Sequence, residues 1–491
     1  MFKNNEIKQT ADTARRLQVG CSTIRSLEKN ERQKTRYIPS MLDPGSVFDE
    51  NGDMRTSLAF FTVLLFSVTV SAGELSTPKQ LHAEIEAELE RTLNLWYPGS
   101  LDRDRGGFHT RLGRDWKPLP YETKGIVHQS RMTWTAAEAG HRRPEWKEKM
   151  LPIVRSGSKF LREKFWDDDF GGFYWEIAAD GTPPTDTAEM KHAYGISFAI
   201  YALATSYALT GDEEDRAMAS LAFFWFDKHA HDKLNGGYCE ALYRNGARML
   251  TPPEGKPELK KGKVGELLGC KSMNTHIHLL ESYTALYKVW PDERLRQRLE
   301  ELLHIVRDRI TTWPGAMRQF FRDDWTPAAT YVSFGHDVET AFLMQETVDV
   351  LGRPEDMLTR NVGRALVDHA LEFGWDAKHG GFYRDGATFG HPADTRKDWW
   401  CHAEGLNTLL LMHQLHGSER DFSDGRYYAA FVKQWEFIKK FVIDPEYGGW
   451  IALTDADGSN PQGFDKSHFW KTSYHECRAL LNVVERLKND D

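Results

Sequence analysis

A Gly-Gly pair followed by an aromatic residue recurs five times after residue 73, and this repeat constrains the fold more than any other feature of the chain. The first glycines of successive copies are 65, 65, 144 and 68 residues apart. Because 144 residues is close to two periods, we expect a degenerate sixth copy in the gap, at residues 313–325. The five complete copies begin at Gly106, Gly171, Gly236, Gly380 and Gly448.

The segments between these copies carry two stretches of apolar residues with a spacing near 3.6, which predicts a pair of helices in each repeat. Each Gly-Gly-aromatic copy with the charged turn that follows it predicts a short β-hairpin. Six helical pairs favour an all-α (α/α)6 barrel, with inner helices around a central pocket and the hairpins at one mouth. An open helical solenoid is the alternative. We expect residues 73–491 to form this barrel as a single catalytic domain.

The composition excludes several classes of protein. The chain has 491 residues, is 40% hydrophobic and contains 16 tryptophans, so it can bury a large core. Its formal net charge is −9 and the body of the chain has no basic block, which argues against nucleic-acid binding. No apolar run reaches the length that a membrane span needs, so we expect no stable membrane span.

The N-terminal region resembles a secretory signal that lies downstream of an extension. Met54 and Arg55 precede a short apolar segment, residues 57–72, which ends in small residues typical of a cleavage site. We therefore expect residues 1–53 to be a non-native or disordered extension, residues 54–72 to be a signal peptide, and the mature chain to be periplasmic or secreted. If residues 1–53 are translated and mask the signal, the protein is cytoplasmic. A buried apolar helix is the alternative for residues 57–72.

The cysteines that remain after such cleavage show no metal-binding or CxxC spacing, and the sequence leaves their pairing open. They are Cys239, Cys270, Cys401 and Cys477.

The segment SFGHDVETAFLMQE places His336 and Glu339 three residues apart, just after Gly335. If a helix begins there, the two side chains share a face. The helix N-terminus disfavours imidazolium and the carboxylate favours it, so His336 could work as an acid or a base near neutral pH. The alternative is a structural histidine with a surface partner.

Every predicted inner helix carries polar or aromatic residues near its start. Tryptophans stack on sugar rings, histidines act as acids and bases, and an arginine stabilises a developing oxyanion. Two histidines on opposite sides of a carbon next to a carbonyl could epimerise it. Three histidines could instead bind zinc, although no HxxxH or acidic ligand cluster accompanies them, and we expect no metal. The residues are Arg131, Trp134, Tyr194, Asn274, His278, His336, Glu339, Trp399, Trp400, Glu404, Trp470, Tyr474, His475 and Arg478.

Four motifs in this set resemble the N-acylglucosamine 2-epimerase superfamily, and most of all its cellobiose 2-epimerase branch. The motifs are NTHIHLLE, SFGHDVE, WW-x-x-AE at residues 399–404 and W-K-x-x-Y-H-x-x-R at residues 470–478. The resemblance covers roughly residues 81–487. It implies an (α/α)6 barrel that opens a reducing sugar and removes and returns the C2 proton through a cis-enediolate, without a redox cofactor.

The resemblance also implies a role for each matching residue. His336 and His475 are the acid and base at C2, and Glu339 tunes His336. His278 with Asn274 serves ring opening, and Arg131 holds the enediolate oxygens. The sugar subsites are lined by Tyr194, Trp399, Trp400, Trp470 and Glu404. The sequence departs from the family pattern at three positions, which are Phe334, His402 and Glu476.

Several functions remain open on the sequence alone. A cellobiose-type disaccharide or an N-acylglucosamine are candidate substrates of a 2-epimerase. An aldose-ketose isomerase could use the same residues. An (α/α)6 glycoside hydrolase needs two carboxylates that flank the scissile bond, and a sugar-binding protein needs no catalytic residue. The expected partner is a small sugar, and the expected oligomeric state is a monomer or a homodimer.

Overall fold

The computed structural model describes residues 77–488, except residues 187–188, 390 and 418–424. The described residues belong to the compact unit Ala72–Asp491. The predicted extension and signal peptide lie outside the described residues. Across the part of the chain that is described, no helix combines the length and the apolar character needed to span a membrane.

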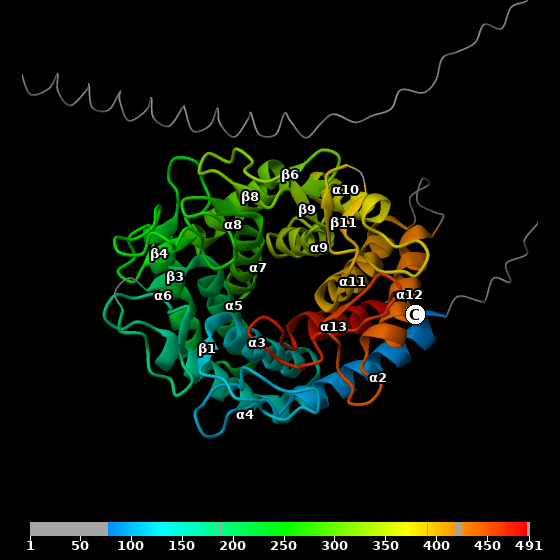
Figure 1. The fold of residues 1–491 in the computed structure, drawn as a ribbon, viewed down its shortest axis with the longest axis horizontal. Coiled ribbons are helices and arrows are strands. Elements are labelled where there is room, and N and C mark those ends of the chain that lie inside the picture. The colour runs from blue at the N-terminus through cyan, green and yellow to red at the C-terminus, as the bar shows by residue number, and fades with distance from the viewer. Residues whose placement is uncertain (1–76, 187–188, 390, 418–424, 489–491) are drawn as a thin grey trace, which may run out of the picture. The chain divides into compact units, whose positions relative to one another are not determined.

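Twelve α-helices of the described chain form two concentric rings (Figure 1). Each inner helix packs against the next, and the last inner helix returns to the first. This closure confirms the predicted (α/α)6 barrel and excludes an open solenoid. The inner helices are α3 (Ile126–Arg142), α5 (Ala193–Thr210), α7 (Met273–Val289), α9 (Phe334–Val350), α11 (Trp399–His416) and α13 (Tyr474–Lys488). The outer helices are α2 (Pro78–Trp96), α4 (Pro144–Phe160), α6 (Glu213–Ala230), α8 (Glu293–Ile305), α10 (Met357–Phe373) and α12 (Arg426–Phe437).

The two rings differ because their helices bury different faces. Helix α5 in the inner ring is buried on almost every side, and its sequence is correspondingly apolar all round. Helix α8 in the outer ring buries one stripe, which includes Leu295, Leu299 and Leu302. Asp292 caps this helix by accepting hydrogen bonds from two backbone amides of its first turn. Most of the buried apolar residues form one continuous core between the rings.

Three outer helices end in a five-residue π-helical turn. These turns are η1 (Leu161–Phe165) after α4, η2 (Val306–Ile310) after α8 and η4 (Ile438–Val442) after α12.

Short antiparallel strand pairs lie at the mouth where the inner helices begin. The predicted local hairpins exist as turns closed by isolated bridges, such as Leu242 with Arg248. However, the strand that follows most copies also pairs with the strand that leads into the preceding inner helix, and this longer-range pairing has no signal in the sequence. The pairs are β1 (Thr123–Gly125) with β2 (Glu176–Ala178), β3 (Met190–His192) with β4 (Ala241–Tyr243), β5 (Lys271–Ser272) with β8 (Phe320–Phe321), β9 (Tyr331–Ser333) with β10 (Asp385–Ala387), and β12 (Lys397–Asp398) with β13 (Leu453–Thr454). Strand β10 also pairs with β11 (Pro392–Asp394) on its other edge.

The predicted sixth copy is a hairpin without the Gly-Gly pair. It consists of β6 (Thr311–Thr312) and β7 (Ala316–Met317), with Trp313 at its tip.

The Gly-Gly pairs are required by backbone conformation and by close packing. Both glycines of every complete copy have positive φ values, which residues with a side chain rarely adopt. A Cβ atom on Gly107 would also lie 2.4 Å from Oε1 of Gln129. An aspartate stands four residues before each first glycine and forms a buried ion pair with the lysine that precedes the next inner helix or, for the last copy, with Lys466. These pairs are Asp102–Lys124, Asp167–Lys191, Asp232–Lys271, Asp376–Lys397 and Asp444–Lys466, at 2.7–2.9 Å.

Candidate active site

A cavity of about 430 Å³ opens at the mouth where the strands lead into the inner helices. It gathers every residue to which the family resemblance assigns a role except Glu404, which lies directly behind His475. Five further residues that the sequence analysis did not select also line it. The predicted lining residues are Arg131, Tyr194, Asn274, His278, His336, Glu339, Trp399, Trp400, Trp470 and His475, and the additional ones are Lys263, Val264, Arg384, Asp398 and His468.

Three of the four imidazoles that line the cavity, those of His278, His336 and His475, have Nδ1 hydrogen-bonded to a protein oxygen, whereas Nδ1 of His468 accepts from backbone amides. Nδ1 of His278 lies 2.9 Å from Oε2 of Glu281, and Nδ1 of His475 lies 2.6 Å from Oε1 of Glu404. Nδ1 of His336 lies 2.9 Å from the Ser333 hydroxyl. A carboxylate only accepts hydrogen bonds, so Nδ1–H is the donor in the two glutamate pairs. Nε2 is then the atom that can exchange protons with a substrate.

His336 and His475 face the same space. The Trp400 ring centroid lies 4.6 Å from that of His336 and 5.9 Å from that of His475. Burial lowers the pKa of His336, while the Glu339 and Glu404 carboxylates oppose this shift. Burial also lowers the pKa of His475 well below its usual value, and the Arg131 guanidinium adds to the effect. Both imidazoles can therefore give up a proton readily at neutral pH.

The buried Arg478 guanidinium holds the carboxylates beneath the histidines, a role that the family resemblance did not imply. It donates a hydrogen bond to Glu281 and lies 2.7 Å from Oε1 of Glu404. It also donates a hydrogen bond of 2.5 Å to Oε1 of Glu339. The signal in the sequence was the position of Arg478 one helical turn after His475, which puts both side chains on one face of α13.

Glu339 does not contact His336 as its position in the sequence suggested. One carboxylate oxygen of Glu339 is held by Arg478, and the other is buried without a protein hydrogen bond among the described residues. Glu339 acts on His336 through space, by raising its pKa against the effect of burial. The reason is geometric, because Arg478 reaches Glu339 from α13 across the barrel while Ser333 occupies Nδ1 of His336.

Arg131 and Asn274 present polar groups to the same cavity. Arg131 donates a hydrogen bond of 2.9 Å to the Tyr194 hydroxyl and one of 3.3 Å to the Trp470 carbonyl. Its guanidinium carbon also lies 4.4 Å from the Phe198 ring centroid, which fixes its plane. Oδ1 of Asn274 is buried and has no hydrogen-bond donor within the described protein. A sugar hydroxyl at this point would satisfy it.

The three sequence departures do not line the cavity, and neither do Trp134, Tyr474 and Arg478. Phe334 and His402 are fully buried behind it, and Glu476 accepts a hydrogen bond of 2.7 Å from Nε1 of Trp96. His276, the first histidine of NTHIHLLE, does not line the cavity and accepts a hydrogen bond from the Tyr238 amide. Trp134 lines a different cavity, on the far side of Arg478.

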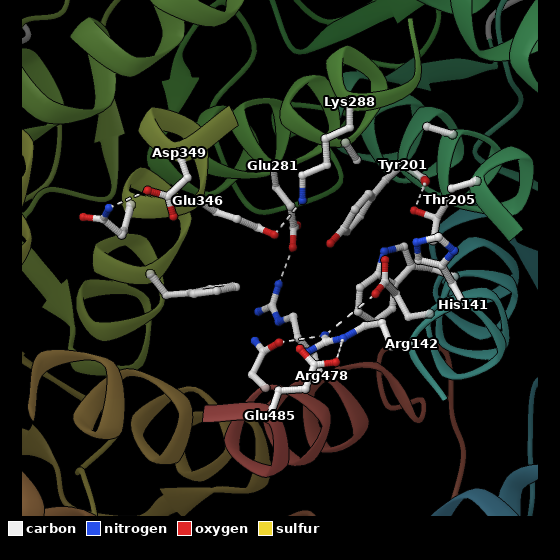
Figure 2. Close-up of a pocket in the computed structure, with 18 of the residues that line it drawn as sticks. His141, Arg142, Tyr201, Thr205, Glu281, Lys288, Glu346, Asp349, Arg478 and Glu485 are labelled. Atoms are coloured by element: carbon white, nitrogen blue, oxygen red, sulfur yellow. Dashed lines mark hydrogen bonds and ion pairs between the residues drawn. The ribbon is translucent and has the colours of Figure 1, made fainter. Parts of the chain in front are cut away.

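That second cavity, of about 660 Å³, occupies the opposite end of the barrel (Figure 2). Arg478 and Glu281 point toward one another in Figure 2, and the other oxygen of Glu281 contacts Nδ1 of His278 in the first cavity. Its charged side chains are tied mainly to one another, for example Lys288 with Glu346 at 3.0 Å and Arg142 with Glu485 at 2.6 Å. It contains none of the three candidate catalytic histidines.

Two buried clusters of the described chain have donor atoms close enough for a metal ion. In the cluster of Glu339, Glu404 and His475, the Arg478 guanidinium already contacts both carboxylates, and this charge opposes a cation. In the second cluster, Nδ1 of His192 accepts a hydrogen bond from the Tyr194 amide and Nε2 lies 2.8 Å from Glu266. Nε2 therefore carries the proton of the neutral ring and has no lone pair for a metal. Both clusters fit hydrogen-bond networks better than metal sites.

The chain is similar to known sugar epimerases over most of its length. Residues 106–479 match the N-acylglucosamine 2-epimerase (GlcNAc 2-epimerase) family. The cellobiose 2-epimerase of Bacteroides fragilis is 33% identical over 82% of this chain and 98% of its own length, and that of Ruminococcus albus is 29% identical over 82% and 98%. The structure of cellobiose 2-epimerase from Spirochaeta thermophila superposes with a TM-score of 0.73 at 30% identity, over 84% of this chain and 98% of that chain.

Proposed function

Because the chain belongs to the N-acylglucosamine 2-epimerase family, we propose that it is a carbohydrate 2-epimerase that acts on a reducing disaccharide of the cellobiose type. The observation that carries the proposal is the set of three imidazoles, each held through Nδ1, around one cavity that Arg131 also lines. The cellobiose 2-epimerases that resemble the chain support the choice of substrate class.

The proposed reaction begins with opening of the sugar ring. His278, with Asn274 beside it, transfers the proton between the anomeric hydroxyl and the ring oxygen, which leaves an aldehyde at C1. Glu281 holds His278 in the required tautomer through Nδ1. Arg131, which lines the same cavity, then stabilises negative charge on the oxygens of C1 and C2.

The C2 proton is then removed on one side and returned on the other. One imidazole of the pair His336 and His475 starts neutral and takes the C2 proton through Nε2, and the C–H electrons form the cis-enediolate. The other imidazole starts protonated and donates its proton to the opposite face of C2, which forms the new C–H bond. The two imidazoles end with their protonation states exchanged, and the reverse reaction uses them in the opposite order.

A hydrolase mechanism fits this geometry poorly. A glycoside hydrolase needs two carboxyl groups that face the scissile bond and are free to act on it. Glu281, Glu339 and Glu404 are instead gathered on the single Arg478 guanidinium beneath the imidazoles. The carboxylates therefore fit a role in positioning histidines.

The experiment that tests the proposal is incubation of the purified protein with glucose, mannose, cellobiose, mannobiose and N-acetylglucosamine in heavy water, followed by NMR. We expect deuterium at C2 together with the C2 epimer of a disaccharide. A ketose product would identify an aldose-ketose isomerase instead. If no sugar of the panel exchanges its C2 hydrogen, the proposed function is wrong.

We also propose that the protein is exported, on the basis of residues 54–72 alone. The test is N-terminal sequencing of the protein recovered from the periplasm or the medium of a bacterial host that expresses it from Met54. Export with cleavage predicts a start near Gly73, and an intact Met54 in the cytoplasm would contradict it.

A further inference from the structure

The floor and the rim of the active-site cavity differ in exposure. His278, Arg131 and His475 are almost fully buried at the floor. Trp470 is 38% exposed, and the Lys263 side chain is 30% exposed. A sugar that reacts at the imidazoles therefore directs any second unit toward this rim, which is formed by Trp470, Lys263 and the 39% exposed Arg384 side chain. No residue near Lys263 in sequence belongs to the motifs that identify the family.

Lys263 is at the tip of a small hairpin in the long connection between β4 and β5. The Leu268 amide donates a hydrogen bond of 3.0 Å to the Lys260 carbonyl, and the Gly262 amide donates one of 2.9 Å to the Glu266 carbonyl. Lys261 and Leu267 form an antiparallel bridge between them. The tip, which includes Lys263 and Val264, forms part of the cavity wall.

The buried Glu266 side chain holds this tip against the barrel. One carboxylate oxygen lies 2.8 Å from Nε2 of His192, and the other accepts a hydrogen bond of 3.3 Å from the Val264 amide. A Cβ atom on Gly262 would lie 1.5 Å from the Glu266 carboxylate, so only glycine lets the carboxylate fold under the turn. His192 in turn accepts a hydrogen bond from the amide of Tyr194, a cavity residue. The tip is therefore fixed relative to the catalytic floor.

The same connection is anchored a second time by a small apolar cluster. Leu259 and Leu268, at the base of the hairpin, pack on the buried residues Met190, Ala241 and Met249. A connection of this length that is packed and anchored in this way is typical of a binding loop.

The Lys263 ammonium can donate hydrogen bonds to a ligand. Its nearest carboxylate is that of Glu189 at 4.0 Å, which is too long for a direct hydrogen bond. Nζ lies 5.8 Å from the ring centroid of Trp175, and that ring lies 6.0 Å from the Trp470 ring. A flat apolar ring and an ammonium donor on one side of the rim match the apolar face and the hydroxyl oxygens of a pyranose.

We propose that Lys263 is a specificity-determining residue, whose ammonium donates a hydrogen bond to the second sugar unit of a disaccharide, and that Glu266 is the residue that positions it. The inference rests on the proposed function, because the second unit is defined only when the first is at the imidazoles. It predicts that Lys263 affects the choice between a disaccharide and a monosaccharide and leaves the proton-transfer steps unchanged.

The test compares Lys263→Ala with the parent on cellobiose and on glucose. We expect KM for cellobiose to rise about tenfold, as for loss of one hydrogen bond to a charged group, with kcat within about twofold. The kcat/KM for glucose should not change. The matched control is Lys261→Ala, which removes an exposed lysine of the same hairpin. An unchanged KM for cellobiose, or an equal loss for both sugars, would overturn the role of Lys263.

Glu266→Gln tests the positioning role. It keeps an acceptor for the Val264 amide but weakens the contact with His192, so we expect a rise in the KM for cellobiose without a change in kcat on glucose. A fall of kcat on both sugars would overturn the role, because Glu266 would then act through His192 and Tyr194 on the catalytic floor.

The failure of this inference can be separated from failure of the proposed function. If the parent epimerises no sugar, cellobiose and glucose are titrated against tryptophan fluorescence. The Lys263→Ala variant should then lose affinity about tenfold for cellobiose only. An unchanged ratio of the two dissociation constants would overturn the role of Lys263 whatever the reaction is.

Discussion

The Arg478 guanidinium lies 2.7 Å from the Glu404 oxygen that itself lies 2.6 Å from Nδ1 of His475. The same guanidinium bonds Glu281, which holds Nδ1 of His278. One buried cation therefore fixes two glutamate–histidine pairs that come from three inner helices. The orientation of both imidazoles therefore depends on a residue that does not line the cavity into which they face.

Replacing Arg478 by lysine should lower kcat and have little effect on KM. A lysine keeps the charge but loses the fork that bridges Glu281 and Glu404. Misplacing a catalytic group by about 1 Å can cost about a hundredfold in rate, so we expect kcat to fall 10- to 100-fold. Steady-state kinetics on cellobiose measure the change. Arg486→Lys, on the same helix in the far cavity, is the matched control. A variant with the parent kcat would show that the bridge does not position the imidazoles.

His336→Asn and His475→Asn should each lower epimerisation by about 10²- to 10⁴-fold, the usual contribution of a general acid or base. Each variant keeps one imidazole, which can still remove the C2 hydrogen that faces it. We therefore expect one variant to exchange C2 hydrogen from the gluco sugar and the other from the manno sugar. NMR in heavy water separates the two epimers. Exchange of both epimers by a single variant would mean that one base serves both faces.

Lys124→Met should destabilise the barrel by about 3–5 kcal/mol, the usual cost of leaving a buried charge without its partner. Lys124 is fully buried and lies 2.9 Å from Asp102, which is 2% exposed. The double variant with Asp102→Asn should recover part of the loss, because no unpaired carboxylate remains. Urea unfolding measures the free energy of unfolding of the single and the double variant. Lys117→Met removes an exposed lysine and is the control. If Lys124→Met lowers the free energy of unfolding much less than this, the prediction is wrong, and Arg105 and Tyr121 compensate for the missing ammonium through their hydrogen bonds to Asp102.

Asp398→Asn should stabilise the protein at pH 7.5 and have little effect at pH 4. Burial raises the pKa of Asp398 from 3.8 to about 6, against the attraction of Arg384, while Asp385 adds repulsion. A raised carboxyl pKa means that the folded state holds its proton more tightly, so ionisation costs stability as pH rises from about 4 to about 6. The asparagine variant avoids this cost, by about 1–3 kcal/mol. The gain in stability is measured as the difference in thermal midpoint between Asp398→Asn and the parent at pH 4 and at pH 7.5. An equal difference at the two pH values would contradict the prediction.

The barrel could be predicted from the sequence because its signals are local and repeated. The 65-residue period identifies the repeats, and the 3.6-residue spacing identifies two helices in each. The same spacing puts Asn274 and His278 on one face of α7, and both line the cavity. Residues 1–53 and the predicted signal peptide lie outside the described residues, and that prediction stays open.

The partners of the site residues could not be predicted in the same way. His336 and Glu339 are close in sequence, yet their hydrogen bonds go to Ser333 and Arg478. The Asp–Lys pairs had a visible signal, since an aspartate stands four residues before every Gly-Gly, but nothing in the sequence placed a lysine against each one. Lys263 belongs to a connection without helical spacing, so no sequence pattern predicted that it lines the cavity.

The sequence by itself determined the repeat, the helical faces and the residue types that face the barrel axis, because each depends on neighbours within a few turns. Only the tertiary structure decided which glutamate holds which histidine. Glu404 and His475 are 71 residues apart, and Glu281 and Arg478 are 197 residues apart. Such pairs form only when the barrel assembles, since assembly brings carboxylates of α7, α9 and α11 to the one buried guanidinium of α13.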